Sequence, residues 1–265
     1  MNDKLGIPRV QALKQAGEKI VALTAYDTSF AAILDTAGVD IALVGDSLGM
    51  VLQGQEDTLS VTMDDMVYHS SLVSRACRRA LVVVDMPYLS YETPALACAN
   101  ARRLVQEGGA EVVKLEGGEE QAQTVAHLVE QGIPVCGHVG MQPQSVRAYG
   151  GFKVQGREQH QAQRIMAGAL ALQRAGAAMV VLECIPASLA ARISRALTIP
   201  TIGIGAGEQC DGQVLVIYDM LGISPYRPHL AKNFLAGSGS VSAAIEEYVR
   251  AVRAGEFPGS EHSFK

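Results

Sequence analysis

Short runs of Val, Ile and Leu recur along the chain, separated by longer segments in which polar and apolar residues mix. Eight such runs span residues 19–27, 40–47, 81–87, 111–118, 133–140, 178–186, 199–207 and 212–220. The segments between them, such as 92–107 and 158–174, place their apolar residues at helical spacing. This alternation predicts parallel β-strands joined by crossover helices.

The number of strand and helix units favours a closed (β/α)8 barrel, the TIM-barrel fold of the α/β class. The chain has 265 residues, and one such barrel needs about 250. An open, doubly wound sheet gives a similar local pattern and stays an alternative. No Pro/Ser-rich linker divides the sequence, so we expect a single domain over residues 1–265, with helical extensions at the N-terminal and C-terminal ends.

Composition and charge indicate a compact protein that acts on small molecules. The formal net charge is −5 and 48% of the residues are hydrophobic, whereas a nucleic-acid surface needs a basic stripe. The five cysteines have no CxxC spacing and lie mostly in apolar stretches, which is typical of reduced core residues. No segment has the apolar character of a membrane span or a signal peptide. We therefore expect a cytoplasmic protein that binds neither nucleic acid nor membranes.

Three of the apolar runs end in an acidic residue, at Asp46, Asp85 and Glu116. In a barrel, the carboxyl ends of the strands meet at one rim, where function resides. A buried carboxylate is costly there without a cation or water nearby, and oxygen ligands without accompanying His or Cys favour magnesium. Each acid taken alone could equally be a helix N-cap or a loop residue. Together they predict a magnesium site.

Other strand ends supply Asp27, His138, Glu183 and Asp219. Glu183 ends a strand with almost no other polar group, and burial favours the uncharged form of a carboxyl, which suits this residue to proton transfer. It is the best candidate for a general base, with helix capping as the alternative. His138 is flanked by glycines that allow close approach of a ligand, although a lone histidine is more often a satisfied polar residue.

The strand at residues 111–118 should present a cation beside its carboxylate. Side chains two apart in a strand point the same way, so Lys114 and Glu116 are expected to face the barrel interior. Val113 and Leu115 should then face the helices. Lys114 is either half of a structural ion pair or an anchor for the substrate.

Residues 140–157 form a segment too long and too rich in Gly for an ordinary connection, and we interpret it as a loop at the mouth of the barrel. Arg147, Lys153 and Arg157 make this loop basic, so it could hold an anionic cofactor tail, with a solvated surface as the simpler interpretation. The IGIGAG segment at 202–207 lacks the spacing and the following acid of a dinucleotide site.

These residues predict a type of reaction. A magnesium ion on the acidic strand ends could bind the carboxylate and keto oxygens of a 2-oxo acid and act as a Lewis acid. A base could then remove the neighbouring C–H proton to give an enolate. Attack of this enolate on an electrophilic carbon would form a C–C bond by an aldol-type addition.

Several longer motifs follow one another along the chain: VGDSLGM at 44–50, VKLEGG at 113–118, VCGHVG at 135–140, PQSV at 143–146, GGFKVQGR at 150–157, IGIGAG at 202–207, AKNFLA at 231–236 and PGSEHSFK at 258–265. This series closely resembles the 3-methyl-2-oxobutanoate hydroxymethyltransferase family, also called the ketopantoate hydroxymethyltransferases. The resemblance runs from about Lys19 to the last residue.

The resemblance implies transfer of a one-carbon unit from 5,10-methylenetetrahydrofolate to 3-methyl-2-oxobutanoate. The product is 2-dehydropantoate, on the pathway to pantothenate and coenzyme A. The family fold is a (β/α)8 barrel that assembles as a homo-oligomer, typically a decamer.

The resemblance also implies roles for residues at matching motif positions. The residues that would hold the oxo acid are Asp46, Ser47, Asp85, Lys114 and His138. The magnesium ion (Mg²⁺) would be handled by Asp46, Asp85 and Glu116. Glu183 would be the proton acceptor.

Two other functions fit parts of the pattern. A lyase of the related phosphoenolpyruvate and oxo-acid barrels would share the metal and enolate chemistry, but such enzymes tend to carry a reactive cysteine in a KKCG-like loop, which is absent from this sequence. A non-catalytic metabolite-binding protein could use the same scaffold, although the complete set of candidate residues argues against a decayed enzyme.

Overall fold

Eight parallel strands pair side by side in chain order and close into one barrel, because β8 also pairs with β1. The computed structural model describes residues 4–225 and 227–265, so residues 1–3 and 226 of the predicted domain lie outside the described residues. The strands are β1 (Ile20–Thr24), β2 (Ile41–Val44), β3 (Leu81–Asp85), β4 (Val112–Glu116), β5 (Val135–Gly140), β6 (Met179–Glu183), β7 (Thr201–Ile204) and β8 (Gly212–Leu215). Each strand lies inside one of the apolar runs, which confirms the (β/α)8 barrel and excludes the open sheet.

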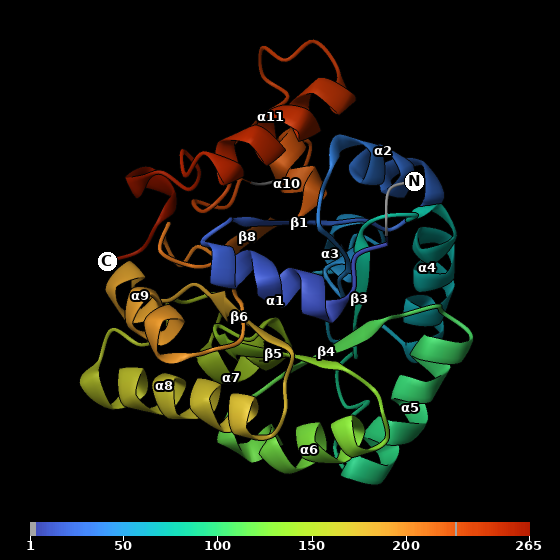
Figure 1. Ribbon diagram of the computed structural model, residues 1–265, viewed down its shortest axis with the longest axis vertical. Coiled ribbons are helices and arrows are strands. Elements are labelled where there is room, and N and C mark those ends of the chain that lie inside the picture. The colour runs from blue at the N-terminus through green and yellow to red at the C-terminus, as the bar shows by residue number, and fades with distance from the viewer. Residues whose placement is uncertain (1–3, 226) are drawn as a thin grey trace.

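Helices surround the barrel (Figure 1). The α-helices are α1 (Ile7–Ala16), α2 (Thr28–Ala37), α3 (Leu48–Val51), α4 (Met63–Ala76), α5 (Pro94–Gln106), α6 (Ala122–Glu130), α7 (Val146–Tyr149), α8 (Gln159–Arg174), α9 (Ala187–Ala196), α10 (Ile217–Leu221) and α11 (Val241–Arg253). Short 3-10 helices are η1 (Glu119–Gln121), η2 (Pro143–Ser145) and η3 (Ser260–His262). The two predicted helical segments correspond to α5 and α8.

The strands read as continuous apolar runs because both of their faces are buried. One face forms the barrel interior, with side chains such as Ile20, Val83 and Val112 in one cluster. The other face packs against the helices and includes Val113 and Leu115, as the alternation along β4 predicts.

Helix α1 closes the end of the barrel where the strands begin, and it lies across the front of the barrel in Figure 1. Val10 packs into the inner cluster. Lys14 Nζ donates hydrogen bonds to the carbonyl oxygens of Ser194 and Ile199, each at 3.0 Å. Lys14 Nζ also pairs with Asp211 Oδ2 at 2.8 Å. With this end covered, the carboxyl ends of the strands are the open end of the barrel.

The cysteines and helices agree with the expectations from composition. All five cysteines are free thiols, and four of them are buried. Within the described part of the chain, no helix combines the length and apolar character that crossing a membrane requires.

Candidate active site

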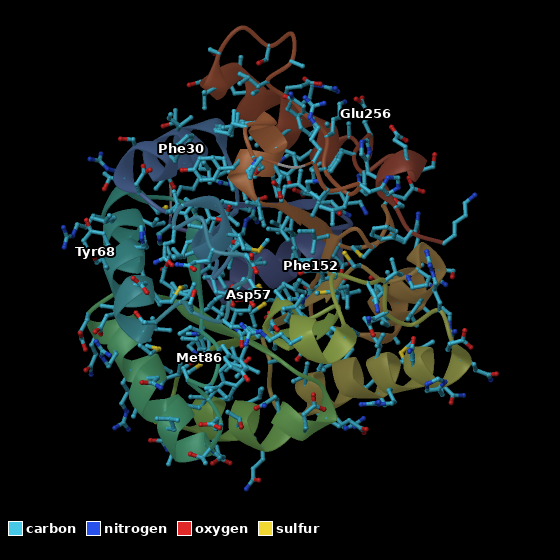
Figure 2. The ribbon with its side chains drawn as sticks, turned by 180° about the vertical axis from the view of Figure 1, so that it is seen from behind. Phe30, Asp57, Tyr68, Met86, Phe152 and Glu256 are labelled. Atoms are coloured by element: carbon cyan, nitrogen blue, oxygen red, sulfur yellow. The ribbon has the colours of Figure 1, made fainter. Side chains whose placement is uncertain are left out.

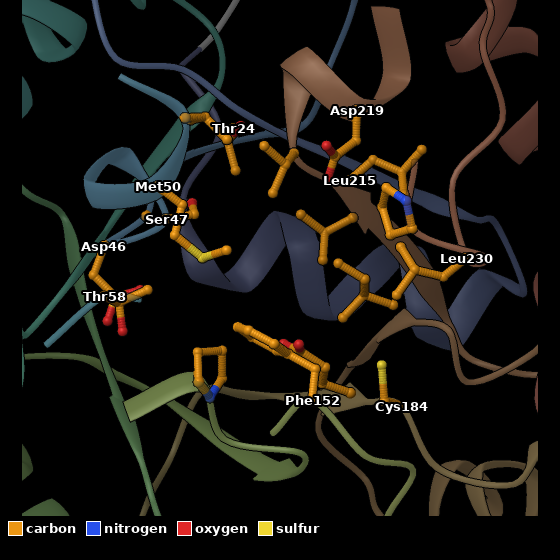
Figure 3. A pocket seen from close by; sticks show the side chains of 18 of the residues that line it. Thr24, Asp46, Ser47, Met50, Thr58, Phe152, Cys184, Leu215, Asp219 and Leu230 are labelled. Atoms are coloured by element: carbon orange, nitrogen blue, oxygen red, sulfur yellow. The ribbon is translucent and has the colours of Figure 1, made fainter. Parts of the chain in front are cut away.

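A cavity of about 720 Å³ opens at the carboxyl ends of the strands (Figure 3). Figure 2 views the molecule from this side, with Phe152 and Asp57 near the middle of the picture. The predicted site residues that line the cavity are Asp46, Ser47, Asp85, Lys114, Glu116, His138 and Glu183. The fold therefore gathers the whole predicted set, supplied by β3 to β6 and the segment after β2, around one space.

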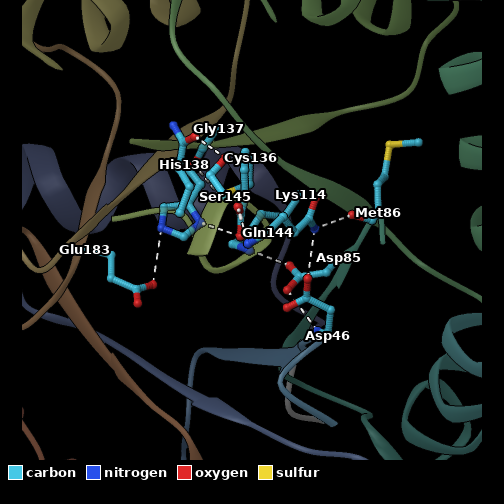
Figure 4. Close-up of polar contacts among 12 residues, drawn as sticks. Asp46, Asp85, Met86, Lys114, Cys136, Gly137, His138, Gln144, Ser145 and Glu183 are labelled. Atoms are coloured by element: carbon cyan, nitrogen blue, oxygen red, sulfur yellow. Dashed lines mark hydrogen bonds and ion pairs between the residues drawn. The ribbon is translucent and has the colours of Figure 1, made fainter. Parts of the chain in front are cut away.

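Asp46, Asp85 and Lys114 form a buried polar cluster on one side of the cavity (Figure 4). Asp85 and Lys114 are register partners on β3 and β4, which brings Lys114 Nζ to 2.7 Å from Asp85 Oδ1. The backbone N–H of Asp46 donates to Asp85 Oδ2 at 3.0 Å. Parallel pairing of adjacent strands thus fixes these three residues relative to one another.

The surroundings of this cluster disfavour the charged forms of Asp46 and Glu116. Burial, and next the charge of Asp85, raise the pKa of Asp46 well above its usual range. Burial, and next the charge of Asp46, raise the pKa of Glu116. Burial opposes the charge of Lys114, but its carboxylate neighbours, Asp85 first, outweigh burial and raise its pKa. Three acids around one ammonium group leave an excess of negative charge that a bound cation would relieve.

His138 and Glu183 form a second polar group, on β5 and β6. His138 Nε2 lies 3.2 Å from Glu183 Oε2, and Nδ1 lies 3.6 Å from Glu116 Oε1. Within residues 4–225 and 227–265, neither ring nitrogen nor Glu116 Oε1 has a partner with hydrogen-bond geometry. Burial, and next the charge of Lys114, lower the pKa of His138 and favour the uncharged ring. Unsatisfied buried polar atoms are typical of a site whose ligand supplies the missing bonds.

The local backbone holds Glu183 at the rim. Gly140 at the end of β5 has a φ of +103°, and a Cβ there would collide with the carbonyl oxygen of Glu183. The backbone N–H of Met141 instead donates to that oxygen at 2.9 Å. Directly after Glu183, Cys184 adopts a left-handed φ of +46°, and its N–H donates to Ile204 on β7. The side chain of Glu183 is 16% exposed, and the residue lines the cavity.

Two site residues escaped the sequence analysis. Gln144, in η2, donates from Nε2 to Asp46 Oδ2 at 2.8 Å and from its backbone N–H to Glu116 Oε2 at 3.0 Å. Tyr91, between β3 and α5, donates its hydroxyl to Gln144 Oε1. The unusual length of the 140–157 segment marks this loop, but a neutral glutamine within it gives no signal of its own in the sequence.

The long loop lies at the mouth, as predicted, but its three basic residues have different surroundings. Lys153 lines the cavity beside Phe152. Arg147 points outward and pairs with Asp57 at 3.2 Å. Arg157 Nε donates to the carbonyl oxygen of Lys265 at 3.2 Å, away from the site.

The two remaining acids that we placed at strand ends have different surroundings. Asp27 caps α2, where its side chain accepts from the N–H of Phe30 at 2.9 Å, as the N-cap interpretation of such acids predicts. The placement of Asp219 at a strand end is wrong, because β8 ends at Leu215 and Asp219 lies in α10. It still lines the cavity and accepts a hydrogen bond from Ser224.

The donor atoms suit magnesium in one particular mode. Nowhere in the described ranges do three His, Cys, Asp or Glu side chains stand close enough to form a ready metal cluster. Mg²⁺ commonly takes one or two carboxylates and completes its shell with water and substrate oxygens. The neighbouring Asp46 and Asp85, with Glu116 Oε1 unpaired among residues 4–225 and 227–265, fit this mode rather than a cage of three carboxylates.

Known proteins resemble this chain over nearly its whole length. The family model described as ketopantoate hydroxymethyltransferase matches residues 4–260. A 3-methyl-2-oxobutanoate hydroxymethyltransferase of Halorhodospira halophila is 56% identical over 259 residues, which cover 98% of this chain and 94% of that protein. The protein of the same name from Burkholderia mallei (strain SAVP1) is 56% identical over 259 residues, covering 97% of this chain and 95% of that protein.

Among solved structures, the barrel is similar to 2,3-dimethylmalate lyase, a member of the PEP mutase/isocitrate lyase superfamily. The TM-score is 0.61 at 17% sequence identity, and the match covers 96% of this chain and 89% of that chain. At this identity the likeness concerns the fold alone.

Proposed function

Because the chain belongs to the ketopantoate hydroxymethyltransferase family, we propose that it transfers the one-carbon unit of 5,10-methylenetetrahydrofolate to 3-methyl-2-oxobutanoate in a magnesium-dependent reaction. The product is 2-dehydropantoate. Family membership establishes a hydroxymethyltransferase that acts on 3-methyl-2-oxobutanoate and sets aside the lyase and the non-catalytic alternatives. The donor, the ion and the roles of the residues are the proposed part.

The observation that best supports this reaction is the division of the rim into two polar groups. Asp46, Asp85 and Lys114 come from β3, β4 and the segment after β2, whereas His138 and Glu183 come from β5 and β6. One group can hold the charged end of an oxo acid, while the other stands ready to exchange a proton. An enolate-forming enzyme needs these two tasks on separate side chains.

The first group would bind and orient the substrate. Mg²⁺, when held by Asp46 and Asp85, would polarise the keto group and make the neighbouring C–H bond more acidic. Lys114 would offset the negative charge of the bound carboxylate. Ser47, whose Oγ shares a hydrogen bond with Tyr26 at 2.8 Å, would offer its hydroxyl to the same ligand.

The second group would move the proton. Glu183 would take the proton from C3 of the oxo acid, and the electron pair of that C–H bond would form the new bond to the methylene carbon of the folate. The two C–N bonds that hold this carbon break, and the oxygen of a water molecule becomes the hydroxyl of the product. The two released nitrogens take up one proton from that water and the one that Glu183 removed from C3. The ring nitrogens of His138, which have no hydrogen-bond partner within the described residues, would contact the oxo acid beside Glu183.

The rest of the cavity would admit the donor and limit access of water. Its apolar wall includes Phe152, Val181, Leu230 and Phe264. A volume of about 720 Å³ is in the range of pockets that bury a drug-sized ligand, so a small oxo acid would leave room for the reactive end of a folate. Cys184 also lines this wall, but burial raises the pKa of its thiol and makes it a poor nucleophile.

We also propose that the protein is cytoplasmic and forms a homo-oligomer, with a decamer as the expected size. The five free thiols support a reducing compartment. Large apolar side chains that stay exposed on α4, α5 and the segment after β3 support an interface between copies, and they are Tyr68, Tyr88, Leu89 and Leu96. Light scattering coupled to gel filtration measures the assembly directly.

Product formation tests the proposed reaction. Purified enzyme with 3-methyl-2-oxobutanoate and 5,10-methylenetetrahydrofolate should form 2-dehydropantoate with Mg²⁺ present and stop when a chelator is added. The variants Asp46→Ala and Asp85→Ala should lose the response to Mg²⁺. Full turnover in chelator, or in either variant, would contradict the metal assignment, and turnover without the folate would contradict the donor.

A further inference from the structure

Gln144 stands at the centre of the hydrogen bonds that link the acids of the site (Figure 4). Its side chain donates to Asp46 Oδ2 at 2.8 Å and to the carbonyl oxygen of Met86 at 2.9 Å. Its backbone N–H donates to Glu116 Oε2 at 3.0 Å. The residue is 6% exposed, so these contacts form away from bulk water, where bonds to a charged acceptor are strong.

The contacts leave one orientation for the amide group of Gln144. Both hydrogens of Nε2 face acceptors, at Asp46 and Met86. The hydroxyl of Tyr91 donates to Oε1 on the other side of the amide. A flipped amide would point its oxygen at a carboxylate oxygen and a carbonyl oxygen, which would repel it because neither can donate a hydrogen bond. Gln144 is therefore a rigid element of the site, although its loop lies at the mouth.

Gln144 donates a hydrogen bond to one carboxylate oxygen of Asp46 and to one of Glu116. Asp46 Oδ2 and Glu116 Oε2 accept from Gln144, which leaves Asp46 Oδ1 and Glu116 Oε1 free of it. Glu116 Oε1 is buried, and it lacks a hydrogen-bond partner anywhere in the described ranges. An unsatisfied buried carboxylate oxygen can accept a hydrogen bond or bind a cation.

We propose that Gln144 is a positioning residue: it fixes Asp46 and Glu116 so that Asp46 Oδ1 and Glu116 Oε1 are presented to Mg²⁺ and its bound waters. This inference rests on the proposed magnesium-dependent function. A carboxylate at this position would add a further negative charge to a cluster that already has an excess, which explains why a neutral amide suits it.

The test is the affinity of the purified enzyme for Mg²⁺, measured by calorimetry without substrates, together with kcat and KM for 3-methyl-2-oxobutanoate. Gln144→Leu keeps the size of the side chain and removes its hydrogen bonds. We expect Mg²⁺ affinity to fall about 10-fold, the usual scale for residues that orient metal ligands. KM should rise. The melting temperature should fall as well, because Asp46 Oδ2 and the carbonyl oxygen of Met86 lose their buried donor. A purely structural role would lower only the melting temperature and leave Mg²⁺ affinity per folded molecule unchanged.

Gln142→Leu is the matched control, because Gln142 lies in the same loop and contacts Ser145 and Tyr149 instead of the acids. Tyr91→Phe is the milder variant and serves as the test if Gln144→Leu does not fold. It removes only the hydroxyl, which donates to Gln144 Oε1 and accepts a long bond of 3.4 Å from the backbone N–H of Glu116. It should weaken Mg²⁺ binding in the same direction by a smaller factor.

Parental Mg²⁺ affinity and KM in Gln144→Leu, or in Tyr91→Phe if only that variant folds, would overturn the proposal. A parent enzyme that does not bind Mg²⁺ would instead contradict the proposed function. In that case, the KM values of Gln144→Leu and Gln142→Leu for 3-methyl-2-oxobutanoate are compared. A higher KM in Gln144→Leu supports a role for Gln144 in positioning the acids for the substrate, and equal KM values contradict it.

Discussion

Lys114 Nζ lies 2.7 Å from Asp85 Oδ1, and the two side chains are only 6% and 4% exposed. This pair joins β3 to β4 at the rim and sets a positive charge against the acids that line the cavity. Its removal should therefore affect both the fold and the site.

Lys114→Met leaves Asp85 as a buried carboxylate without its counter-ion. Breaking a buried pair from one side costs about 3–5 kcal/mol of unfolding free energy, and denaturant titration in chelator should show a loss of this order. The double variant Lys114→Met/Asp85→Leu removes both charges and should recover much of the loss. Equal losses in the single and double variants would show that the pair carries no such coupling.

Asp46→Asn removes one charge from the buried acids while keeping an acceptor for Gln144. Because burial and Asp85 disfavour the charged form of Asp46, the melting temperature in chelator should rise by a few degrees. The stabilisation that Mg²⁺ gives the parent should disappear. Differential scanning calorimetry measures both effects.

The control for this variant is Asp64→Asn, an 83% exposed acid on α4, which should follow the parent. A lower melting temperature in chelator for Asp46→Asn, with the response to Mg²⁺ retained, would contradict the role of Asp46 as a strained ligand.

Two basic residues of the long loop should respond differently to truncation. Lys153 lines the cavity, whereas Arg147 is 78% exposed and already paired with Asp57. Lys153→Ala should raise KM for 5,10-methylenetetrahydrofolate, because it removes a positive charge from the lining of the space proposed for an anionic donor. Arg147→Ala should leave that KM unchanged and alter stability by less than about 1 kcal/mol, as for other surface pairs. The opposite ranking in steady-state kinetics would place the folate elsewhere.

The barrel could be predicted because strands that are buried on both faces consist almost entirely of apolar residues, and such runs are easily recognised in the sequence. Apolar runs of this length between helical segments favour buried strands, and in a barrel an acid at the carboxyl end of such a strand is expected at the common rim. The alternation in β4 was enough to place Lys114 and Glu116 inside and Val113 and Leu115 outside.

Gln144 and Tyr91 could not be predicted by the same reasoning. Their contacts depend on how an irregular loop after β5 folds back over the strand ends, and hydrophobic periodicity carries no information about that path. For Asp219, the sequence predicted too long a strand. The acid was assigned to the end of β8, but β8 ends at Leu215 and Asp219 lies in the following helix.

The central claim is that Glu183 removes the C3 proton of the oxo acid, and proton exchange tests it without the folate. In D₂O with Mg²⁺, the parent enzyme should exchange the C3 hydrogen of 3-methyl-2-oxobutanoate, followed by proton NMR, and so should a control variant at an exposed glutamate on α11, Glu246→Gln. Glu183→Gln should fold and bind Mg²⁺ normally but exchange about 10²–10⁴ times more slowly, the scale of general base catalysis. Exchange by Glu183→Gln at the parental rate would contradict the account.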